Sequence, residues 1–564
     1  MNVVGISAFY HDSACCVLQD GRLVAAAQEE RFSRIKGDAR LPWRAFRYCL
    51  SEAGLHPGEV DVLAFYEDPA GRWSRQAAWG HPRHPALDPR EMVRRRLGYH
   101  GPVRTFDHHA SHAASAFLFS PHDGAAVLTA DGVGEWATTT YAVGEGPRLE
   151  MLEEVRFPHS IGLFYGALTR WLGFPVNGGE GTVMALAALG RPRLAGILGG
   201  LLRDGTGGSF ELDTELFPFD HTMGSPELES VLGIPPRRAG EPLTEDHADL
   251  AASLQDVVER LVLDTVAYLR ATTGAHSLCL AGGVALNCVL NGRIAREAGF
   301  SEVFIQPAPG DAGGALGAAA LAHVEATGRR PQPLSHPFLG PSFDPEIYLA
   351  GTAVPYHRHE SEEALLVEAV ARLEAGQVIG WYQGRMEFGP RALGARSLLA
   401  DPRSSALRDR INARIKGRES FRPFGISVLQ EGAEQCLDGP VQAPWMQLTC
   451  GVAPELGAVR HVDGTTRPQL VSPKTEPRFS RLLKAWSDRT GCPGLLNTSL
   501  NTRGEPLVCS PVDAVFTLAE GGFDALFMDC YRVEALPAEW TPLLGAWRGP
   551  VHRAGPVSYT HLRA

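Results

Sequence analysis

Three short apolar runs open the chain and predict an antiparallel meander. They span residues 2–7, 14–18 and 23–28, and a polar loop that contains His11 separates the first run from the second. An Asp-Gly step at residues 20–21 joins the second run to the third, and this dipeptide between apolar runs is a strong hairpin signal. We therefore expect the chain to begin with three neighbouring antiparallel strands.

A second strand–loop–strand unit occurs further along and predicts a duplicated fold. Residues 125–130 are an apolar run, residues 131–135 a loop with two glycines and two acids, and residues 136–143 another run. The phosphate-binding hairpins of actin-like and sugar-kinase-like ATPases have this form. The echo is one of architecture and not a sequence repeat.

The histidines at positions 108 and 112 fall on one face of a predicted helix. Asp107 is a candidate N-cap, and the helix is expected to run to Phe119. Residues four apart share a helix face, so the rings of His108 and His112 project together, whereas His109 points elsewhere.

Two carboxylates are expected near these rings. Asp131 ends the apolar strand 125–130, and Asp311 stands between the strand 303–306 and a helix of Ala and Leu. Two imidazoles and two carboxylates suit a divalent transition metal such as iron, zinc or manganese. The alternative is a pair of ordinary histidines, one capping and one packed.

A glycine pair follows another predicted strand, at residues 278–280. The strand–glycine–helix step is suited to a close backbone approach to a phosphate or a nucleoside. The candidate binding residues are Gly282, Gly283 and Asn287. A tight turn needs the same glycines, which is the alternative interpretation.

The length of the chain and its prolines predict two domains. A chain of 564 residues is too long for one core. Residues 329–345 hold five prolines without periodicity and read as a linker. We predict a first domain at 1–328, a linker at 329–347, a second domain at 348–545 and a tail at 546–564.

Charge and cysteine usage exclude several classes. A net charge of −11 argues against a dedicated nucleic-acid-binding protein. Ten cysteines without a CxxC spacing indicate reduced thiols in a cytoplasm. The N-terminus lacks a basic signal-peptide start, and no apolar run approaches the ~18 residues that a membrane span needs.

A basic stretch marks the second predicted domain. Between residues 385 and 422 ten Arg or Lys stand against four acids, a net excess of six in a chain whose total is −11. Such an excess needs an anion, and the Arg fork holds phosphate or carboxylate through two bonds. The ten are Arg385, Arg391, Arg396, Arg403, Arg408, Arg410, Arg414, Lys416, Arg418 and Arg422.

A solvated helix face does not explain every member of this stretch. Arg391 stands between turn residues, and Lys416 and Arg422 lie near an aromatic turn at 421–424 that should be partly buried. Further anion-binding donors are expected in loops at 466–469 and 496–501. The pattern favours phosphate chemistry, while the solvated face accounts for Arg403, Arg408 and Arg410.

Together the motifs resemble one family, the O-carbamoyltransferases of antibiotic biosynthesis and nodulation-factor modification. The matches run in order from about residue 3 to residue 510. The matching segments are residues 11–14, 29–32, 107–112, 131–132, 178–190, 281–287, 384–394, 422–424, 466–469 and 497–501.

The resemblance implies a fold and a chemistry for each domain. The first would be α/β with an actin-like, duplicated ribonuclease H-like fold, as in the transferase that builds threonylcarbamoyl-adenosine in tRNA. The second would be a twisted open α/β domain of the threonylcarbamoyl-adenylate synthase type. It would form carbamoyl-adenylate from carbamoyl phosphate and ATP with Mg²⁺, and the first domain would move the carbamoyl group to an acceptor hydroxyl.

Motif matching also implies roles for individual residues. Those expected to hold the phosphates are Arg391, Lys416, Arg422 and Arg467, with Asn497 and Ser499 nearby. Those expected to hold Fe²⁺, or another divalent transition metal, are His108, His112, Asp131 and Asp311. The glycine-rich segment contributes Gly178, Gly179 and Glu180 to substrate binding, and His11 and Lys36 would face the transfer site.

His11 is the expected general base, because an unperturbed imidazole titrates near neutral pH. Its alternative role is a hydrogen bond that closes its loop. One departure from the family is Thr182, where the glycine-rich loop often has Lys. It indicates a different acceptor pocket if that Lys contributes to binding.

Two other functions stay open at this point. A sugar-kinase-like phosphotransferase would explain the first domain but not the second, and a regulator that binds nucleotide or carbamoyl phosphate would need no intact transfer site. As partners we expect a small-molecule hydroxyl acceptor and neither nucleic acid nor membrane, and we allow for a homodimer.

Overall fold

The computed structural model describes residues 1–79, 88–205, 207–219, 222–350, 352–439 and 442–536. Within these ranges the chain forms two compact units. The first comprises residues 1–29 and 37–334, and the second comprises residues 30–36 together with the chain from Ser335 onward. The tail predicted at 546–564 lies outside the described residues.

The first unit contains two five-stranded sheets with the same topology. One has the strand order β3-β2-β1-β4-β5 and the other β8-β7-β6-β11-β12. Each begins with a three-stranded antiparallel meander. The first strand of the meander pairs in parallel with a fourth strand, and this fourth strand pairs in parallel with a fifth. The strands are β1 Asn2–Ser7, β2 Ala14–Gln19, β3 Arg22–Gln28, β4 Val62–Phe65, β5 Val103–Thr105, β6 Gly124–Ala130, β7 Ala137–Glu145, β8 Arg148–Arg156, β11 Ser277–Ala281 and β12 Glu302–Ile305.

This repeated order confirms the predicted duplicated, actin-like α/β fold. The meander expected at the N-terminus is present with its Asp20-Gly21 hairpin, and the echo at 125–143 is the start of the second sheet. The short apolar runs and the turn residues between them are local signals, which is why both were readable from sequence.

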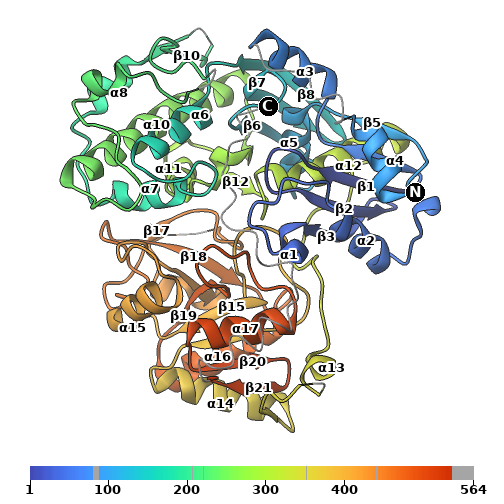
Figure 1. The fold of residues 1–564 in the computed structure, drawn as a ribbon, viewed down its shortest axis with the longest axis vertical. Coiled ribbons are helices and arrows are strands. Elements are labelled where there is room, and N and C mark those ends of the chain that lie inside the picture. The colour runs from blue at the N-terminus through green and yellow to red at the C-terminus, as the bar shows by residue number, and fades with distance from the viewer. Residues whose placement is uncertain (80–87, 206, 220–221, 351, 440–441, 537–564) are drawn as a thin grey trace. The chain divides into compact units, whose positions relative to one another are not determined.

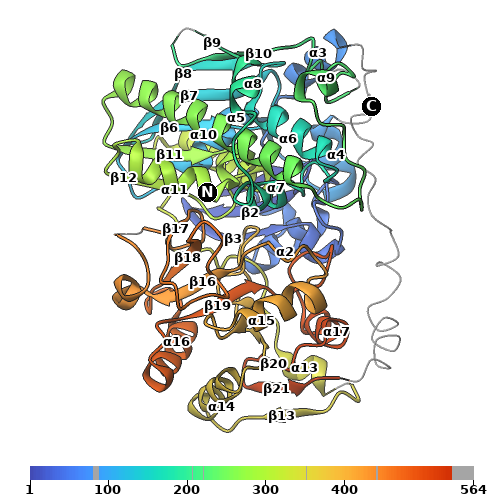
Figure 2. The same ribbon diagram turned by 90° about the vertical axis from the view of Figure 1, so that its left-hand side faces the viewer.

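Helices α5 (His108–Phe117) and α12 (Asp311–Thr327) pack against each other and connect the two sheets (Figures 1 and 2). α12 contacts β1, β2 and β4, whereas α5 contacts strands of the other sheet. The approach is close because of glycine: a Cβ on Gly317 would lie 1.7 Å from the Ser111 carbonyl oxygen, and one on Gly5 1.9 Å from that of Ala315. This packing brings the first residue of α12 to the histidines of α5.

The remaining elements of the first unit are mostly helical. They are α2 Trp43–Glu52, η1 Pro57–Glu59, α3 Pro69–Ala78, α4 Pro89–Leu97, α6 Ile161–Trp171, α7 Glu180–Ala187, α8 Ala195–Gly200, β9 Leu202–Asp204, β10 Phe210–Leu212, α9 Leu228–Leu232, α10 Glu245–Thr273, η2 Gly283–Leu286 and α11 Cys288–Glu297. The segment 191–244, expected as loop, contains α8, β9, β10 and α9. These elements have three to six residues each, too few to show a hydrophobic period.

The second unit is built on a nine-stranded mixed sheet with the order β13-β21-β20-β14-β15-β19-β16-β18-β17. Figure 2 shows α16 and α17 on opposite sides of its strands β19 and β20. The strands are β13 Tyr356–Arg358, β14 Ile379–Tyr382, β15 Arg396–Ala400, β16 Gly425–Leu429, β17 Cys450–Gly451, β18 Thr465–Val471, β19 Gly494–Ser499, β20 Ala525–Met528 and β21 Tyr531–Glu534. The helices are α1 Glu30–Ser33, α13 Pro345–Leu349, α14 Glu362–Glu374, α15 Ser405–Arg410, η3 Ile411–Ile415, η4 Gln430–Gln435, α16 Pro477–Thr490 and α17 Pro511–Gly521. The architecture is an open α/β domain, and its likeness to the synthase type stays a prediction.

Two segments expected in loops are strands of this sheet. Residues 466–469 lie in β18, and residues 496–499 lie in β19. Pro468 is tolerated because β17 pairs with β18 only at Thr465 and Thr466, so the ring nitrogen faces no further ladder bond. The proline and the polar residues in these two segments are typical of loops, which is why the strands β18 and β19 were not predicted from the sequence.

From the sequence we expected neither a membrane-spanning helix nor disulfide bonds. In the part of the chain that the structure describes, no helix combines the length and apolarity needed to cross a bilayer. All ten cysteines are free thiols, and nine of them are buried.

Candidate functional site

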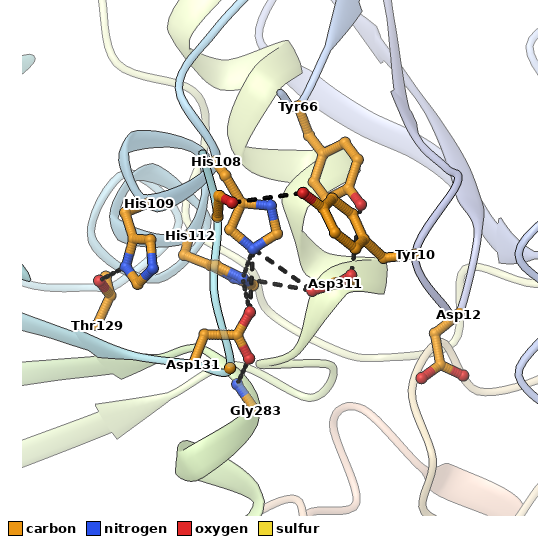
Figure 3. Close-up of polar contacts among 12 residues, drawn as sticks. Tyr10, Asp12, Tyr66, His108, His109, His112, Thr129, Asp131, Gly283 and Asp311 are labelled. Atoms are coloured by element: carbon orange, nitrogen blue, oxygen red, sulfur yellow. Dashed lines mark hydrogen bonds and ion pairs between the residues drawn. The ribbon is translucent and has the colours of Figure 1, made fainter. Parts of the chain in front are cut away.

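Four side chains converge between α5, the end of β6 and the start of α12 (Figure 3). His108 Nε2 lies 3.0 Å from Asp131 Oδ2 and 3.0 Å from His112 Nε2. Asp311 Oδ1 lies 3.6 Å from each of the two Nε2 atoms. All four residues are buried, and one ligand atom from each fits within 4.8 Å of the others. These are the four residues nominated as metal ligands from sequence.

Neighbouring groups orient the two carboxylates. The Gly283 amide donates to Asp131 Oδ1 at 3.0 Å, and the Tyr66 hydroxyl donates to Asp311 Oδ2 at 3.3 Å. A Cβ on Gly283 would lie 2.8 Å from Asp131 Oδ1, so a larger residue would displace the carboxylate. Gly283 thus serves this cluster directly, and Tyr66 is a contributor that sequence reasoning missed.

The N-terminus of α5 is capped by Glu135 and not by Asp107. Asp107 occupies the N-cap position without a side-chain cap bond, and its side chain is exposed. Glu135 accepts from the His108 amide at 3.1 Å and from the Asp68 amide at 2.6 Å. Burial, offset in part by His108, raises the pKa of Glu135 to about 7. The capping group comes from the loop after β6, which no local pattern around residue 107 reveals.

The electrostatics of the cluster favour a cation. Burial opposes a charged His112, but the nearby carboxylates of Asp131 and Asp311 outweigh it and raise its pKa to about 9. Burial likewise opposes ionisation of Asp131, but His108 and His112 hold its pKa well below the usual range. Asp311 Oδ1 has no hydrogen-bond donor among the described residues. Two imidazoles, two carboxylates and this bare oxygen fit a divalent transition metal.

His11 lies at the edge of the same cluster. Its Nδ1 is 2.9 Å from Asp12 Oδ2, and its Nε2 is 3.7 Å from Asp311 Oδ2. Burial lowers the pKa of His11, but Asp311, Asp12 and Asp131 outweigh that effect and raise it to about 10. Asp12 is therefore the partner that sets which ring nitrogen faces the cluster, a role not foreseen from sequence.

The glycine-rich segment approaches His11 through Glu180. Burial raises the pKa of Glu180, while backbone hydrogen bonds and the charge of His11 act against the rise. The Asn177 amide donates to Glu180 Oε1 at 2.8 Å. Gly179 is buried, whereas a Cβ on Gly178 would meet nothing within 4 Å, so the segment leaves open space at Gly178.

Asn287 and Gly282 are used by the fold itself. Asn287 Oδ1 accepts from the Leu290 amide at 3.1 Å as the N-cap of α11, and its amide donates to Gln255 at 3.1 Å. Gly282 has φ 90°, and a Cβ there would lie 2.2 Å from the Ala130 carbonyl oxygen. A role of either residue in nucleotide binding stays a prediction.

In the second unit, the amino group of Lys416 is buried and contacts four oxygen atoms. Its Nζ donates to Ser499 Oγ at 3.2 Å, to Asn501 Oδ1 at 2.6 Å and to the Asn501 carbonyl at 3.1 Å, and also to the Ser499 carbonyl. Burial, reinforced by Arg418, Lys36 and Arg422, lowers its pKa well below the usual value.

Neighbouring arginines strengthen the positive charge around Lys416. Burial and the charge of Arg467 lower the pKa of Arg422, although Glu419 at 3.9 Å opposes this. Arg467 Nε has no hydrogen-bond acceptor among the described residues. Arg418 donates to Asn412 Oδ1 at 2.8 Å and stacks over Phe424. We call Lys416, Arg418, Arg422 and Arg467 the cation cluster.

Lys36 belongs to the second unit and not to the first, with which it was grouped from sequence. The excursion 30–36 of the chain is part of the second unit, and the charge of Lys36 lowers the pKa of Lys416. The transfer site was the expected location of Lys36 because motif matching to the family placed it there.

Arg391 sits on a loop that a buried polar network holds rigid. Glu387 Oε1 accepts from the amides of Leu393 and Ala395 at 2.8 Å and of Arg396 at 3.1 Å. Asn497 Nδ2 donates to the Ala392 carbonyl at 3.2 Å, and Gln469 Nε2 donates to the Leu393 carbonyl at 2.8 Å. Asn497, nominated as a substrate-binding residue, is buried and positions this loop.

Arg396 does not contribute to the positive field expected of the basic stretch. It is fully buried, its guanidinium donates to the carbonyls of Gln383, Gly384, Pro341 and Ala395, and it stacks on Tyr382 at 3.6 Å. The surface members of the stretch pair with acids: Arg403 with Asp401, Arg408 with Asp409 and Arg410 with Asp524.

The network gives the first test, a substitution of Glu476. Its carboxyl accepts from Gln469 Nε2 at 2.7 Å, and burial together with Glu387 raises its pKa to about 9. Because the folded pKa exceeds the usual value, this group stabilises the fold fully below about pH 4.5 and loses that contribution as the pH rises toward 9. We expect Glu476→Gln to remove a pH slope of about 1.4 kcal/mol per pH unit from the free energy of unfolding.

Urea unfolding between about pH 5 and about pH 8 measures this slope. Glu363→Gln, at an exposed position of α14, is the matched control and should unfold like the wild type. If the free energy of unfolding changed with pH at the same rate in Glu476→Gln and in the wild type, the proposed effect of burial on Glu476 would be contradicted.

Comparison with known proteins assigns the family. The family model described as "Carbamoyltransferase N-terminus" matches residues 2–78 and 90–320, and "Carbamoyltransferase C-terminus" matches residues 370–535. The chain belongs to the carbamoyltransferase family. It is therefore a transferase, and the resemblance read from its motifs is confirmed.

Named relatives include a nodulation protein and an O-carbamoyltransferase. The nodulation protein NolNO of Sinorhizobium fredii is 37% identical over 95% of this chain and 81% of its own length. The 3'-hydroxymethylcephem-O-carbamoyltransferase of Streptomyces clavuligerus is 30% identical over 90% of this chain and 94% of its own length. A solved structure, component A of the (R)-2-hydroxyglutaryl-CoA dehydratase of Acidaminococcus fermentans, covers 58% of this chain at 17% identity and a TM-score of 0.32, too distant to carry an argument.

Proposed function

We propose that this carbamoyltransferase is an ATP-dependent O-carbamoyltransferase that works in two steps. In the second unit, water cleaves carbamoyl phosphate to carbamate and phosphate. An oxygen of the carbamate then attacks the α-phosphorus of ATP, which forms carbamoyl-adenylate and releases pyrophosphate. In the first unit, an acceptor hydroxyl attacks the carbonyl carbon, and AMP leaves.

The observation that carries the first step is the buried cation cluster. Adenylate formation joins an anion to a polyanion, so fixed cations and Mg²⁺ bound with ATP must offset their repulsion. Burial, reinforced by Arg418, Lys36 and Arg422, lowers the pKa of Lys416. Burial and the charge of Arg467 lower the pKa of Arg422, and bound phosphate would raise both values again. Arg391 on its rigid loop and Arg467 would add further contacts to phosphate.

The His–Asp cluster supports the second step. His108, His112, Asp131 and Asp311 would hold a divalent metal. That metal would act as a Lewis acid and offset the carboxylate charge that raises the pKa of His11. His11, oriented through Nδ1 by Asp12, would take the proton of the acceptor hydroxyl at Nε2.

The acceptor is proposed to be a natural-product hydroxyl, on an antibiotic or a sugar-containing molecule. The activity for which the Streptomyces relative is named, O-carbamoylation of a 3'-hydroxymethylcephem, supports this class. Iron as the resident metal, a homodimer and a cytoplasmic location belong to the same proposal.

Products formed from ATP test the function. With carbamoyl phosphate and ATP, the purified protein should release pyrophosphate, and it should release none when carbamoyl phosphate is omitted. ADP formation without a need for carbamoyl phosphate would instead indicate a kinase, and no product at all would indicate a binding protein.

Anion binding should be accompanied by proton uptake at Lys416. Its pKa is lowered in the free protein, mainly by burial, and a bound dianion would raise it again. At a pH between the two values, sulfate, which does not itself titrate there, should therefore bind with uptake of protons. Calorimetry in two buffers of different ionisation enthalpy measures the uptake, and proton release on binding would contradict the assignment.

A further inference from the structure

Residues 30–36 leave the first unit after β3 and form part of the second unit. We call this segment the strap. It contains α1 and ends at Lys36, and the chain returns to the first unit at Gly37. The strap carries two arginines, Arg31 and Arg34, that occupy different places in the second unit.

Arg31 holds the loop that carries Arg391. It is 2% exposed, and its Nη2 donates to the Gly389 carbonyl at 2.6 Å. Gly389 stands two residues before Arg391. Phe32 of the strap packs against the buried residues Met386, Ala392, Leu507 and Cys509, which come from the same loop and from the segment that follows β19. The strap therefore joins these two parts of the second unit.

Arg34 holds the segment that follows Ser499. Its Nη2 donates to the Pro506 carbonyl at 2.9 Å and its Nη1 to the Leu507 carbonyl at 2.5 Å. Its Nε lies 3.5 Å from Asp513 Oδ1. A planar fork that reaches two adjacent carbonyls fixes their direction as well as their position.

A short chain of contacts runs from these carbonyls to Lys416. Asn501 Nδ2 donates to the Glu505 carbonyl at 2.7 Å, beside Pro506. Asn501 Oδ1 accepts from Lys416 Nζ at 2.6 Å. The Val508 amide donates to the Leu500 carbonyl at 3.0 Å, which closes the loop around Asn501. Arg34 thus clamps one side of the loop 500–508, and Asn501 on its other side holds Lys416.

We propose that Arg31 and Arg34 are positioning residues for adenylate formation, which the strap supplies from the first half of the sequence. Arg34 fixes the oxygens that hold Lys416, and Arg31 fixes the loop of Arg391. The inference rests on the proposed function, because it assigns a task to these loops. It also means that the catalytic second unit includes residues that precede it by some 300 positions in the chain.

Variants of Arg34 in the full chain test the strap. Arg34→Ala should lower kcat for carbamoyl-phosphate-dependent pyrophosphate release by about 10²-fold, the size of effect that a 1 Å displacement of reacting groups produces. It should also weaken pyrophosphate binding, measured by calorimetry, at least about tenfold, because Lys416 loses its fixed place. Arg34→Lys keeps the charge but cannot hold two carbonyls, so it should recover only part of both losses.

Arg40→Ala is the matched control. Arg40 lies just beyond the strap in the first unit, is exposed and pairs with Asp38. It should leave both readouts within about twofold of the wild type, as an exposed pair contributes little. Full activity and binding in Arg34→Ala, or full rescue by Arg34→Lys, would overturn the inference. A wild-type protein that binds pyrophosphate but makes none would count against the proposed function instead. In that case, the comparison of pyrophosphate binding by Arg34→Ala and by the wild type would still test the role of the strap.

Discussion

Lys416→Ala should lower carbamoyl-phosphate-dependent pyrophosphate release by about 10³-fold or more, comparable to the loss of a cation that stabilises phosphoryl transfer. Lys416 is buried, and its ammonium meets four oxygens of Ser499 and Asn501. The variant loses the charge that would face the phosphates and leaves those oxygens without their donor. Without Lys416, the cation cluster offsets less of the repulsion between the anionic carbamate and ATP, so both binding and turnover should fall.

A matched control for this variant is Arg403→Ala. Arg403 belongs to the same basic stretch, but it is exposed and pairs with Asp401. It should retain pyrophosphate release within about twofold. Lys416→Ala should keep the metal content of the wild type, since the His–Asp cluster lies in the other unit. Ordinary pyrophosphate release by Lys416→Ala would remove the cation cluster from the mechanism.

His108→Ala should show the opposite pattern to Lys416→Ala: loss of metal and of carbamoyl transfer, with pyrophosphate release nearly unchanged. His108 Nε2 lies 3.0 Å from both Asp131 Oδ2 and His112 Nε2, so its removal leaves three ligands and an open position. We expect loss of most bound metal and of carbamoyl transfer by about 10³-fold, with pyrophosphate release within about threefold of the wild type. Elemental analysis, acceptor mass gain and pyrophosphate release are measured on the same preparation.

Two further variants guard this test against simple misfolding. Asp311→Asn keeps the volume of the side chain while it removes a charge, and it should also lose metal. His122→Ala removes a histidine of the same unit that pairs with Glu302 outside the cluster, and it should change neither readout. Equal metal in His108→Ala and the wild type would show that the four residues are not its ligands.

Much of the first unit was readable from local signals. The strands β1, β2 and β3 follow from short apolar runs and an Asp-Gly hairpin, and the helix that presents His108 and His112 follows from their four-residue spacing. Asp131 and Asp311 stand at ends of elements, where polar residues after apolar strands are conspicuous. Their meeting depends on the close packing of α5 and α12, which the glycine Gly317 permits.

What could not be read depends on contacts distant in sequence. Glu135 caps a helix that begins 27 residues earlier, and Arg34 bonds to carbonyls more than 470 residues later. Arg396 resembles its basic neighbours in the sequence, yet its burial against four carbonyls gives it a structural role. Composition predicts how much charge a stretch holds, but only the fold decides which of those charges face a ligand.

The central claim is that one unit makes an activated carbamoyl nucleotide and the other uses it. Its most direct test supplies the wild-type protein with carbon-labelled carbamoyl phosphate and ATP, without an acceptor, and analyses the quenched mixture by mass spectrometry. The account predicts an AMP adduct that carries the label, together with pyrophosphate. ADP as the nucleotide product, with no label on any nucleotide, would contradict it.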